Sequence, residues 1–457
     1  MAVRHDTTTR LTDPRTGLVR REIPVGGARA VVGAVAGARR AQPAWAALTP
    51  ARRARRLLAV ADAIEDRADE YVAAERAGTG KPENEARGEV EQSADVFRFF
   101  AGALRTGSSP AGGHLLPGHE SWVRWEPLGV VAAVVPWNYP LLMTVWRAAP
   151  ALAAGNTVVV KPAETTPDSA LALGRHCDGI LGPGVVTVVP GDRETGRLLV
   201  GSQVDAVAFT GGTAGGLDVV RNAGLRRVSL ELGGNAPAVV LPDAGEETYE
   251  ALVRACTYNA GQSCASPARV ITLRENYQDV VERLAKEMAS RCAGTDFGPL
   301  NNPAQAARYD RMMESSRAGV RHVGGTVTQP GESGGYWRPG QVLADLPSWD
   351  PAVKEEVFAP VLTVQAAPGL DAAVALANSV PQALGASVWS ASVETALSVA
   401  GSLDAGETWI NCHLEQTPEL PHGGRRGSGH GTDLSVLALS EYQRPKTVTV
   451  RHLGRRR

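Results

Sequence analysis

The sequence predicts an α/β protein that consists of two α/β lobes and an additional hairpin-and-tail element. Three observations predict this class. Short β-branched runs separated by helical segments follow residue 128, and a second set of strands and helices follows the stretch RVSLELGGNAPAVVLPDAG. Between the N-terminal helices and the first set, the stretch SWVRW (121–125) alternates as an exposed hairpin strand does. The length of 457 residues is enough for more than one domain.

The segment from Ala28 to about Leu104 is predicted to be helical. Thr49 and Pro50 fit the N-cap and the first position of a helix that runs to Gly80. A second helix is expected to cover about 83–103.

The strands of the first lobe are predicted to form a parallel sheet, because their runs are apolar without alternation, as in strands covered on both faces. They are GVVAAVVP (129–136), NTVVVKP (156–162), VVTVVPG (185–191) and AVAFTGG (206–212). The crossover helices are expected at DSALALGRHCDGIL (168–181) and ETGRLLVGS (194–202). In the second lobe, strands are expected at RVITL (269–273), APVLTVQA (359–366), GASVWSA (385–391) and ETWINC (407–412).

The bulk composition excludes several classes of protein. Lys and Arg number 47 against 48 Asp and Glu, so no nucleic-acid partner is expected. The apolar runs are too short to span a bilayer, and MAVRHDTTTRLTDP has no apolar signal region. The five cysteines are scattered and form no CxxC pair, which predicts neither a metal site nor a disulfide framework. A soluble protein of the reducing cytoplasm is expected.

Two glycine-rich or polar turns follow predicted strands of the first lobe. FTGGTAGG (209–216) lies between a strand and a helix, where backbone N–H groups and the helix dipole can hold a phosphate, although a plain structural turn has the same pattern. KPAE (161–164) follows the strand NTVVV, and Lys161 and Glu164 could there bind ribose hydroxyls or simply be solvated.

Three further residues are candidates for chemistry. Asn138, in VVPWNYP (134–140), could present an amide to an oxyanion or satisfy its own turn. Glu231, in LELGGNAP (230–237), could be a desolvated carboxylate with a raised pKa, suited to a general base, or an exposed strand residue. Cys264, in NAGQSCASPAR (259–269), could be a core filler, a disulfide partner, a metal ligand or a nucleophile.

Taken together, these motifs resemble those of the aldehyde dehydrogenase superfamily. The similarity extends from about residue 10 to 450, and eight motifs occur in the family's order. They are PWNYP, KPAE, FTGGT, LELGGNAP, GQSC, EEVFAPV, GETWIN and PHGGRRGSGHG. The resemblance implies a Rossmann-like NAD-binding domain (1–106 and 128–235), a catalytic α/β domain (236–418) and a small β oligomerisation element (107–127 and 419–457). It also implies a homodimer or homotetramer.

The resemblance implies oxidation of an aldehyde to its carboxylic acid. Cys264 would be the nucleophile, Asn138 would stabilise the oxyanion, and Glu231 would activate water for hydrolysis of the thioester. The cofactor would be NAD, with NADP disfavoured because the Glu164 carboxylate would repel a 2′-phosphate. The implied cofactor-binding residues are Pro136, Trp137, Lys161, Glu164, Phe209, Gly211, Gly212, Thr213, Gly216, Leu232, Glu356 and Phe358. Gly212 replaces the serine that is usual in the family.

The C-terminal segment is most similar to the 4-aminobutyraldehyde (aminoaldehyde) branch of the family, in which His422, Asp433 and Ser435 have counterparts. Glu415, at the expected tunnel mouth, is a candidate partner for a substrate cation, and Arg269 for a substrate carboxylate. The other candidate substrate residues are Tyr139, Met143, Trp146, Glu89, Glu91 and His413.

Other functions stay open on the sequence alone. A broad-specificity or betaine aldehyde dehydrogenase, a CoA-acylating relative and a catalytically silent binding protein are alternatives within the fold. Glu231 argues against the acylating enzyme, which commonly lacks the base. A cysteine hydrolase would need His413 or His422 beside Cys264.

Overall fold

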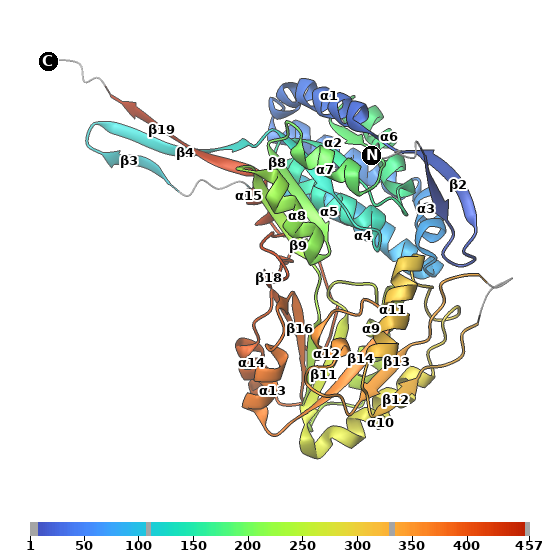
Figure 1. Ribbon diagram of the computed structural model, residues 1–457. Coiled ribbons are helices and arrows are strands. Elements are labelled where there is room, and N and C mark those ends of the chain that lie inside the picture. The colour runs from blue at the N-terminus through green and yellow to red at the C-terminus, as the bar shows by residue number, and fades with distance from the viewer. Residues whose placement is uncertain (1–7, 107–110, 329–333, 453–457) are drawn as a thin grey trace.

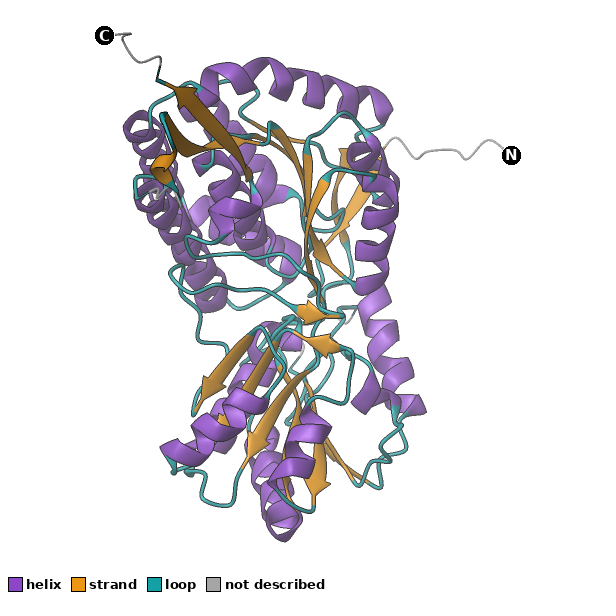
Figure 2. Ribbon diagram, turned by 90° about the vertical axis from the view of Figure 1, so that its left-hand side faces the viewer, coloured by secondary structure: helices purple, strands orange, loops and turns teal. Residues whose placement is uncertain are grey.

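The computed structural model describes residues 8–106, 111–328 and 334–452. Within these ranges the chain forms two α/β lobes, one above the other in Figure 2, and a narrow antiparallel sheet that projects from the upper lobe (Figure 1). The predicted fold class is therefore confirmed. The predicted hairpin segment begins at 107–110 and the predicted tail ends at 453–457, and both stretches lie outside the described residues.

The first lobe contains a five-stranded parallel sheet in the order β7-β6-β5-β8-β9. Its strands are β5 (Val130–Val134), β6 (Thr157–Lys161), β7 (Val186–Val188), β8 (Ala206–Gly211) and β9 (Arg227–Leu232). The helices that connect them are α5 (Pro140–Ala153), α6 (Asp168–Leu181), α7 (Arg193–Gly201) and α8 (Thr213–Ala223). The predicted strands and crossover helices are confirmed. Because the strand order reverses between β5 and β8, their carboxyl ends border the crevice where ligands of such sheets bind.

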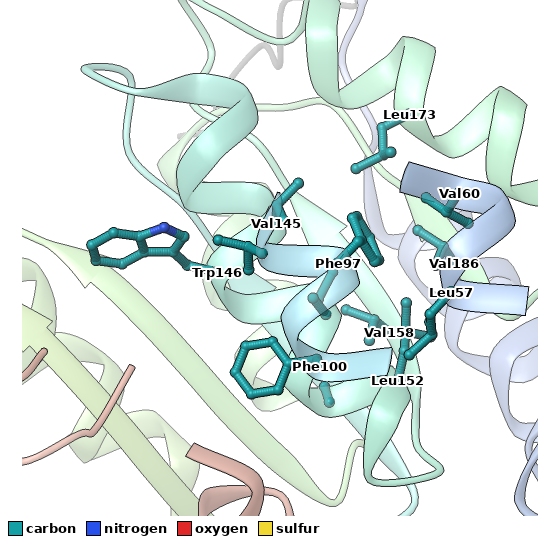
Figure 3. Close-up of a cluster of buried hydrophobic side chains, with 14 of the residues drawn as sticks. Leu57, Val60, Phe97, Phe100, Val145, Trp146, Leu152, Val158, Leu173 and Val186 are labelled. Carbon is teal, nitrogen blue, oxygen red and sulfur yellow. The ribbon is translucent and has the colours of Figure 1, made fainter. Parts of the chain in front are cut away.

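Four N-terminal helices pack around this sheet, and a small hairpin precedes them in the chain. They are α1 (Ala28–Ala46), α2 (Pro50–Glu65), α3 (Ala68–Thr79) and α4 (Glu83–Ala103), and the hairpin pairs β1 (Thr8–Thr12) with β2 (Val19–Pro24). Side chains of α2, α4 and α5 interlock with those of β6 in one apolar core (Figure 3), and every residue of α5 is buried. The single helix predicted from 50 to about 79 is wrong, because the chain leaves helical geometry at Arg67 (φ −119°, ψ 26°).

The second lobe contains a seven-stranded sheet in the order β12-β13-β14-β11-β10-β16-β17, in which only β12 runs antiparallel to its neighbour. Its strands are β10 (Ala236–Val240), β11 (Pro267–Leu273), β12 (Val320–Val323), β13 (Gln341–Ala344), β14 (Val361–Ala367), β16 (Gly385–Trp389) and β17 (Glu407–Ile410). Its helices are α9 (Glu247–Thr257), η1 (Tyr258–Gly261), η2 (Arg274–Asn276), α10 (Tyr277–Ala289), α11 (Pro303–Ser315), α12 (Pro351–Lys354), α13 (Leu370–Ala377) and α14 (Val393–Ser402). The four strands predicted for this lobe are present.

The projecting sheet has the order β19-β4-β3, with β3 (Gly112–Leu116), β4 (His119–Pro127) and β19 (Gln443–Arg451). β19 pairs with β4 over its whole length, so the chain's last described strand returns to the hairpin after α15 (Ala438–Glu441). A two-residue ladder of β15 (Gln382–Ala383) and β18 (Arg425–Arg426) lies near the junction of the lobes (Figure 1). Among the described helices, none has the length and apolar character needed to cross a membrane.

Candidate active site

The three candidate catalytic residues meet between the two lobes. Asn138 follows β5, Glu231 is the penultimate residue of β9, and Cys264 precedes β11. Glu231 and Asn138 are buried, at 1% and 5% exposure. Glu231 is therefore not the exposed strand residue that was its alternative interpretation. The Cys264 sulfur, a Glu231 carboxylate oxygen and a His422 ring nitrogen all lie within 4.8 Å of one another.

The two glycines after Glu231 allow the lobes to approach at this point. A Cβ atom at Gly234 would lie 2.0 Å from the carbonyl oxygen of Cys264, and one at Gly233 would lie 2.1 Å from Oε2 of Glu356. The backbone N–H of Gly234 donates to Oε1 of Glu356 at 3.0 Å. The glycines of LELGG thus create room for the cysteine loop and for a carboxylate of the second lobe.

A left-handed backbone turn presents Cys264. Asn259, Ala260 and Gly261 have φ angles of 49°, 54° and 69°, a conformation that costs free energy in the two residues that carry a Cβ atom. The Asn259 amide donates to the Asn138 carbonyl at 2.9 Å, and its backbone N–H donates to Glu85 at 3.1 Å. These buried hydrogen bonds hold the turn in place.

The Asn138 amide is fixed by the same loop. Its Nδ2 donates one hydrogen to the carbonyl oxygen of Gln262 at 3.0 Å. The backbone carbonyl of Asn138 also accepts from Nζ of Lys81 at 3.0 Å. Because an amide nitrogen carries two hydrogens, the second stays available to an oxygen in the adjoining cavity.

Cys264 lies where two cavities meet. One has a volume of about 410 Å³ and is also lined by Asn138 and Glu231. The other, of about 240 Å³, is also lined by Tyr139 and His422. A thiol at this junction can be reached by one ligand from each cavity.

Most of the predicted cofactor-binding residues line the larger of these two cavities or a neighbouring cavity of about 250 Å³. The lining residues are Pro136, Trp137, Lys161, Glu164, Phe209, Gly211, Gly212, Thr213, Leu232, Glu356 and Phe358. The neighbouring cavity lies at the carboxyl ends of β5, β6 and β8, which is the crevice expected from the strand order. The rings of Trp137 and Phe358 meet edge to face at 5.5 Å.

Lys161 and Glu164 differ in their surroundings. The Lys161 side chain is buried, donates to the Gly191 carbonyl at 3.2 Å and lies 3.8 Å from Glu164, whose side chain is half exposed. Gly216 lines neither cavity. A Cβ atom there would lie 2.6 Å from a methyl group of Leu232, so this glycine instead lets α8 pack closely on β9.

Four predicted substrate residues line the smaller cavity, namely Tyr139, Met143, Trp146 and Glu89. Trp146 points away from the other labelled core side chains (Figure 3). Glu89 is already paired, because both of its carboxylate oxygens accept from Nζ of Lys81 at 2.6 Å. A substrate cation would therefore find the charge of Glu89 largely neutralised.

Three other residues lie away from this cavity. Glu91 is exposed on α4. His413 is buried, and its two ring nitrogens bind Ser387 Oγ and the Ala265 carbonyl, both at 2.8 Å. Arg269 is buried in the second lobe and donates to backbone carbonyls. His413 and Arg269 are both buried and line neither cavity at Cys264, so neither contacts a ligand there. Of the other cysteines, Cys177 and Cys256 are buried in the two cores, whereas Cys292 and Cys412 are half-buried.

His422 also lies at the site, although the sequence predicted a role for it only in the alternative of a cysteine hydrolase. One ring nitrogen, Nδ1, lies 2.8 Å from Oε2 of Glu407, and Nε2 lies 3.5 Å from Oε1 of Glu231. The Trp146 ring stacks edge-on against it at 5.1 Å. Its place in the motif PHGG was the signal available in the sequence.

The pKa of Glu231 is lowered, whereas the sequence pattern predicted that it would be raised. Burial by itself would raise the pKa of this carboxyl, but the adjacent His422 imidazole, together with the charge of the Arg147 guanidinium, lowers it below the usual value. Arg147 in turn pairs with buried Asp433 at 2.8 Å. Burial and the Glu231 charge raise the pKa of the Cys264 thiol above its usual value, whereas His422 acts in the opposite direction.

Comparison with known proteins identifies the family. The model of the aldehyde dehydrogenase family matches residues 2–448, and the chain belongs to this family. DhaS of Bacillus subtilis (strain 168) is 34% identical over 436 residues, which cover 91% of this chain and 87% of that protein.

Solved structures agree over nearly the full length. A structure from Burkholderia cenocepacia, described as that of an aldehyde dehydrogenase, has a TM-score of 0.93 and 34% identity, with 97% of this chain and 96% of the other covered. Betaine aldehyde dehydrogenase from Staphylococcus aureus, in complex with NAD+, has a TM-score of 0.92 and 27% identity, covering 98% and 92%.

Proposed function

We propose that this protein oxidises an aldehyde to its carboxylic acid with NAD+ as the hydride acceptor. The observation that carries the proposal is the position of Cys264, whose sulfur lies at the junction of two cavities and beside Asn138 and Glu231. One cavity suits a dinucleotide and the other suits a small aldehyde. Residues 1–106 with 128–235 would form the NAD-binding domain, and 236–418 the catalytic domain.

The residues have separate roles in the proposed reaction. The Cys264 thiolate attacks the carbonyl carbon, and the resulting oxyanion accepts hydrogen bonds from the Asn138 amide and the Cys264 backbone N–H. NAD+ supplies the acceptor for the hydride that leaves this carbon, and a thioester remains on Cys264.

Glu231 then removes a proton from a water molecule as the water oxygen bonds to the acyl carbon. The carbon–sulfur bond breaks, so that the acid is released and the thiolate returns. Because its pKa is lowered, Glu231 is ionised at neutral pH and ready to accept this proton. The presence of this base favours hydrolysis over transfer of the acyl group to CoA.

The residues of the first lobe fit NAD+ better than NADP+. Lys161 and Glu164 lie at the carboxyl end of β6, where a carboxylate can accept hydrogen bonds from ribose hydroxyls and would repel a 2′-phosphate. Gly212 begins α8 without a side-chain cap, so backbone N–H groups at this helix end are the donors for a phosphate. The Staphylococcus aureus relative, which was crystallised with NAD+, supports the same choice.

For the substrate we propose 4-aminobutyraldehyde or a related aminoaldehyde. The aromatic side chains of Tyr139, Trp146 and Tyr258 line the smaller cavity, and aromatic rings attract cations. The Tyr139 ring already has Nζ of Lys81 4.7 Å from its centre, which leaves Trp146 and Tyr258 for a substrate cation. Glu415 is exposed and also lines this cavity, so its carboxylate can pair with a substrate cation. The carboxylate of Glu89 is already paired with Lys81. The betaine aldehyde dehydrogenase relative is named for a substrate that also carries a cation.

A direct assay tests the proposed reaction and the proposed substrate. The purified protein is incubated with NAD+ or NADP+ and with 4-aminobutyraldehyde, betaine aldehyde, succinate semialdehyde, phenylacetaldehyde or hexanal, while NADH or NADPH formation is followed. We expect turnover with NAD+ and the highest kcat/KM for 4-aminobutyraldehyde. No turnover with any aldehyde would refute the enzymatic proposal, whereas preference for hexanal or phenylacetaldehyde would refute only the aminoaldehyde assignment.

We also propose a homodimer or homotetramer in the cytoplasm. The β19-β4-β3 sheet projects from the body, and its exposed apolar residues include Trp122, Trp125 and Val450. Contact with a second copy would bury them and protect the edges of the sheet. The five cysteines are free, as is usual in the reducing cytoplasm. Light scattering coupled to gel filtration should give two or four times the monomer mass of 48.0 kDa.

A further inference from the structure

His422 occupies a fixed position beside the nucleophile. Its backbone forms a two-way bridge with Asp433, in which N–H of each residue donates to the carbonyl of the other at 2.8 and 2.7 Å. The side chain is 1% exposed, and Trp146 packs against the ring. The imidazole therefore cannot swing away from Cys264 without breaking buried contacts.

The two ring nitrogens of His422 have different partners. Nδ1 lies 2.8 Å from the Glu407 carboxylate and 2.9 Å from the Gln416 amide nitrogen, which itself donates to that carboxylate at 3.1 Å. Because an ionised carboxylate only accepts hydrogen bonds, we assign the Nδ1 hydrogen to the contact with Glu407. Nε2 is directed to the other side, where Glu231 lies 3.5 Å away and the Cys264 sulfur completes a cluster within 4.8 Å. A nucleophile, an imidazole and a carboxylate that orients the imidazole are thus arranged in series.

We propose that His422, positioned by Glu407, is a further catalytic residue that accepts the Cys264 thiol proton and holds the resulting thiolate as an ion pair. The inference rests on the proposed role of Cys264 as nucleophile. In this step the S–H bond breaks, its electron pair stays on sulfur, and a new N–H bond forms at Nε2. The Nδ1 hydrogen remains donated to Glu407, so no atom leaves the site and nothing is oxidised.

The charges around His422 support this direction of proton transfer. Burial lowers the pKa of the imidazole, but Cys264, Glu231 and Glu407 more than compensate and raise it well above its usual value. Arg147 on α5 and Asp433 lie on one side and form a buried ion pair with each other. Glu89, which is paired with Lys81, and the exposed Glu415 line the same cavity as His422. Burial opposes ionisation of the Cys264 thiol. The positive charge of an adjacent imidazolium stabilises the thiolate and so offsets the cost of burying it.

The ionisation of Cys264 can be measured without aldehyde or NAD+. The wild-type protein and the His422→Gln and Glu407→Gln variants are treated with iodoacetamide across a pH series. The rate of alkylation is read at the Cys264 peptide by mass spectrometry, because Cys292 and Cys412 are also partly exposed.

An adjacent opposite charge typically lowers a pKa by about 1–3 units, so His422→Gln should move the midpoint of alkylation upward by at least about one pH unit. This is about tenfold less thiolate below the midpoint. Glu407→Gln should shift the midpoint in the same direction by less, because the amide oxygen still accepts from Nδ1 but carries no charge. His413→Gln is the matched control and should leave the midpoint unchanged, since both nitrogens of His413 are bound away from the sulfur.

A role limited to packing would slow alkylation at every pH without moving the midpoint. An unchanged midpoint in a His422→Gln variant with a wild-type circular dichroism spectrum overturns the inference, and so does an unchanged midpoint in Glu407→Gln. Because the assay uses neither substrate, these outcomes leave the aldehyde screen as a separate test of the proposed function.

Discussion

Replacing Gly234 with alanine should disable the site without any change in its reactive groups. The added Cβ atom would lie 2.0 Å from the Cys264 carbonyl oxygen and 3.2 Å from its carbonyl carbon. Real Cβ contacts to backbone are essentially never below 3.0 Å, so one of the two backbones must move by about 1 Å or more. Both are held in place, since Gly234 is bound to Glu356 and the cysteine loop to Asn138.

A displacement of about 1 Å at a reacting atom can cost about 100-fold in rate. We therefore expect kcat for aldehyde oxidation to fall about 100-fold in Gly234→Ala. Steady-state NADH formation gives the rate, and thermal unfolding shows whether the fold survives. Gly179→Ala is the matched control, because a Cβ atom at this position in α6 meets nothing within 4 Å, and it should retain wild-type activity. A folded Gly234→Ala variant with activity within threefold of wild type would refute this use of the contact geometry.

Three other substitutions test separate parts of the site. Glu231→Gln should keep a rapid burst of NADH and lower steady-state turnover by about 10²- to 10⁴-fold, since only hydrolysis needs the base. Stopped-flow absorbance measures the burst and the steady-state rate, and loss of the burst would contradict this role of Glu231. In the wild type, where the pKa of Glu231 is lowered, the base stays ionised and hydrolysis should persist as the pH falls from about 8 to about 6. Glu164→Gln should narrow the preference for NAD+ over NADP+ by roughly tenfold in kcat/KM, because it removes the charge that repels a 2′-phosphate, and an unaltered ratio would argue against ribose recognition at this residue. Glu415→Gln should lower kcat/KM for 4-aminobutyraldehyde by about two- to fivefold and leave hexanal unaffected, as expected for an exposed charge pair; equal losses for both aldehydes would exclude a role in cation recognition.

The local patterns of the sequence predicted the strands, the connecting helices and the motifs that border the cavities. Each of these features depends on residues close together in the chain, such as the β-branched run of β6 followed by Lys161. The interruption of the long N-terminal helix at Arg67 had no such local mark, since neither proline nor glycine lies there.

The charge state of the site could not be predicted in the same way. Glu231 and His422 are separated by 191 positions, and their contact depends on how the C-terminal segment returns to β9. The pairing of Glu89 with Lys81 depends on the bend between α3 and α4, which brings the two side chains together in the core. A carboxylate in the sequence therefore indicates a chemical group, whereas its effective charge is set by neighbours that only the fold supplies.

Two cavities meet at Cys264, and Met143 is the one other residue that lines both of them. Each ligand thus has its own way in and out of the enzyme. A compound that plugs the smaller cavity should leave the binding of the dinucleotide intact, and the reverse should hold for a nucleotide analogue. Inhibitors of the two kinds should therefore bind together, with noncompetitive patterns against each other's substrate, and a bivalent inhibitor would have to pass the sulfur atom itself.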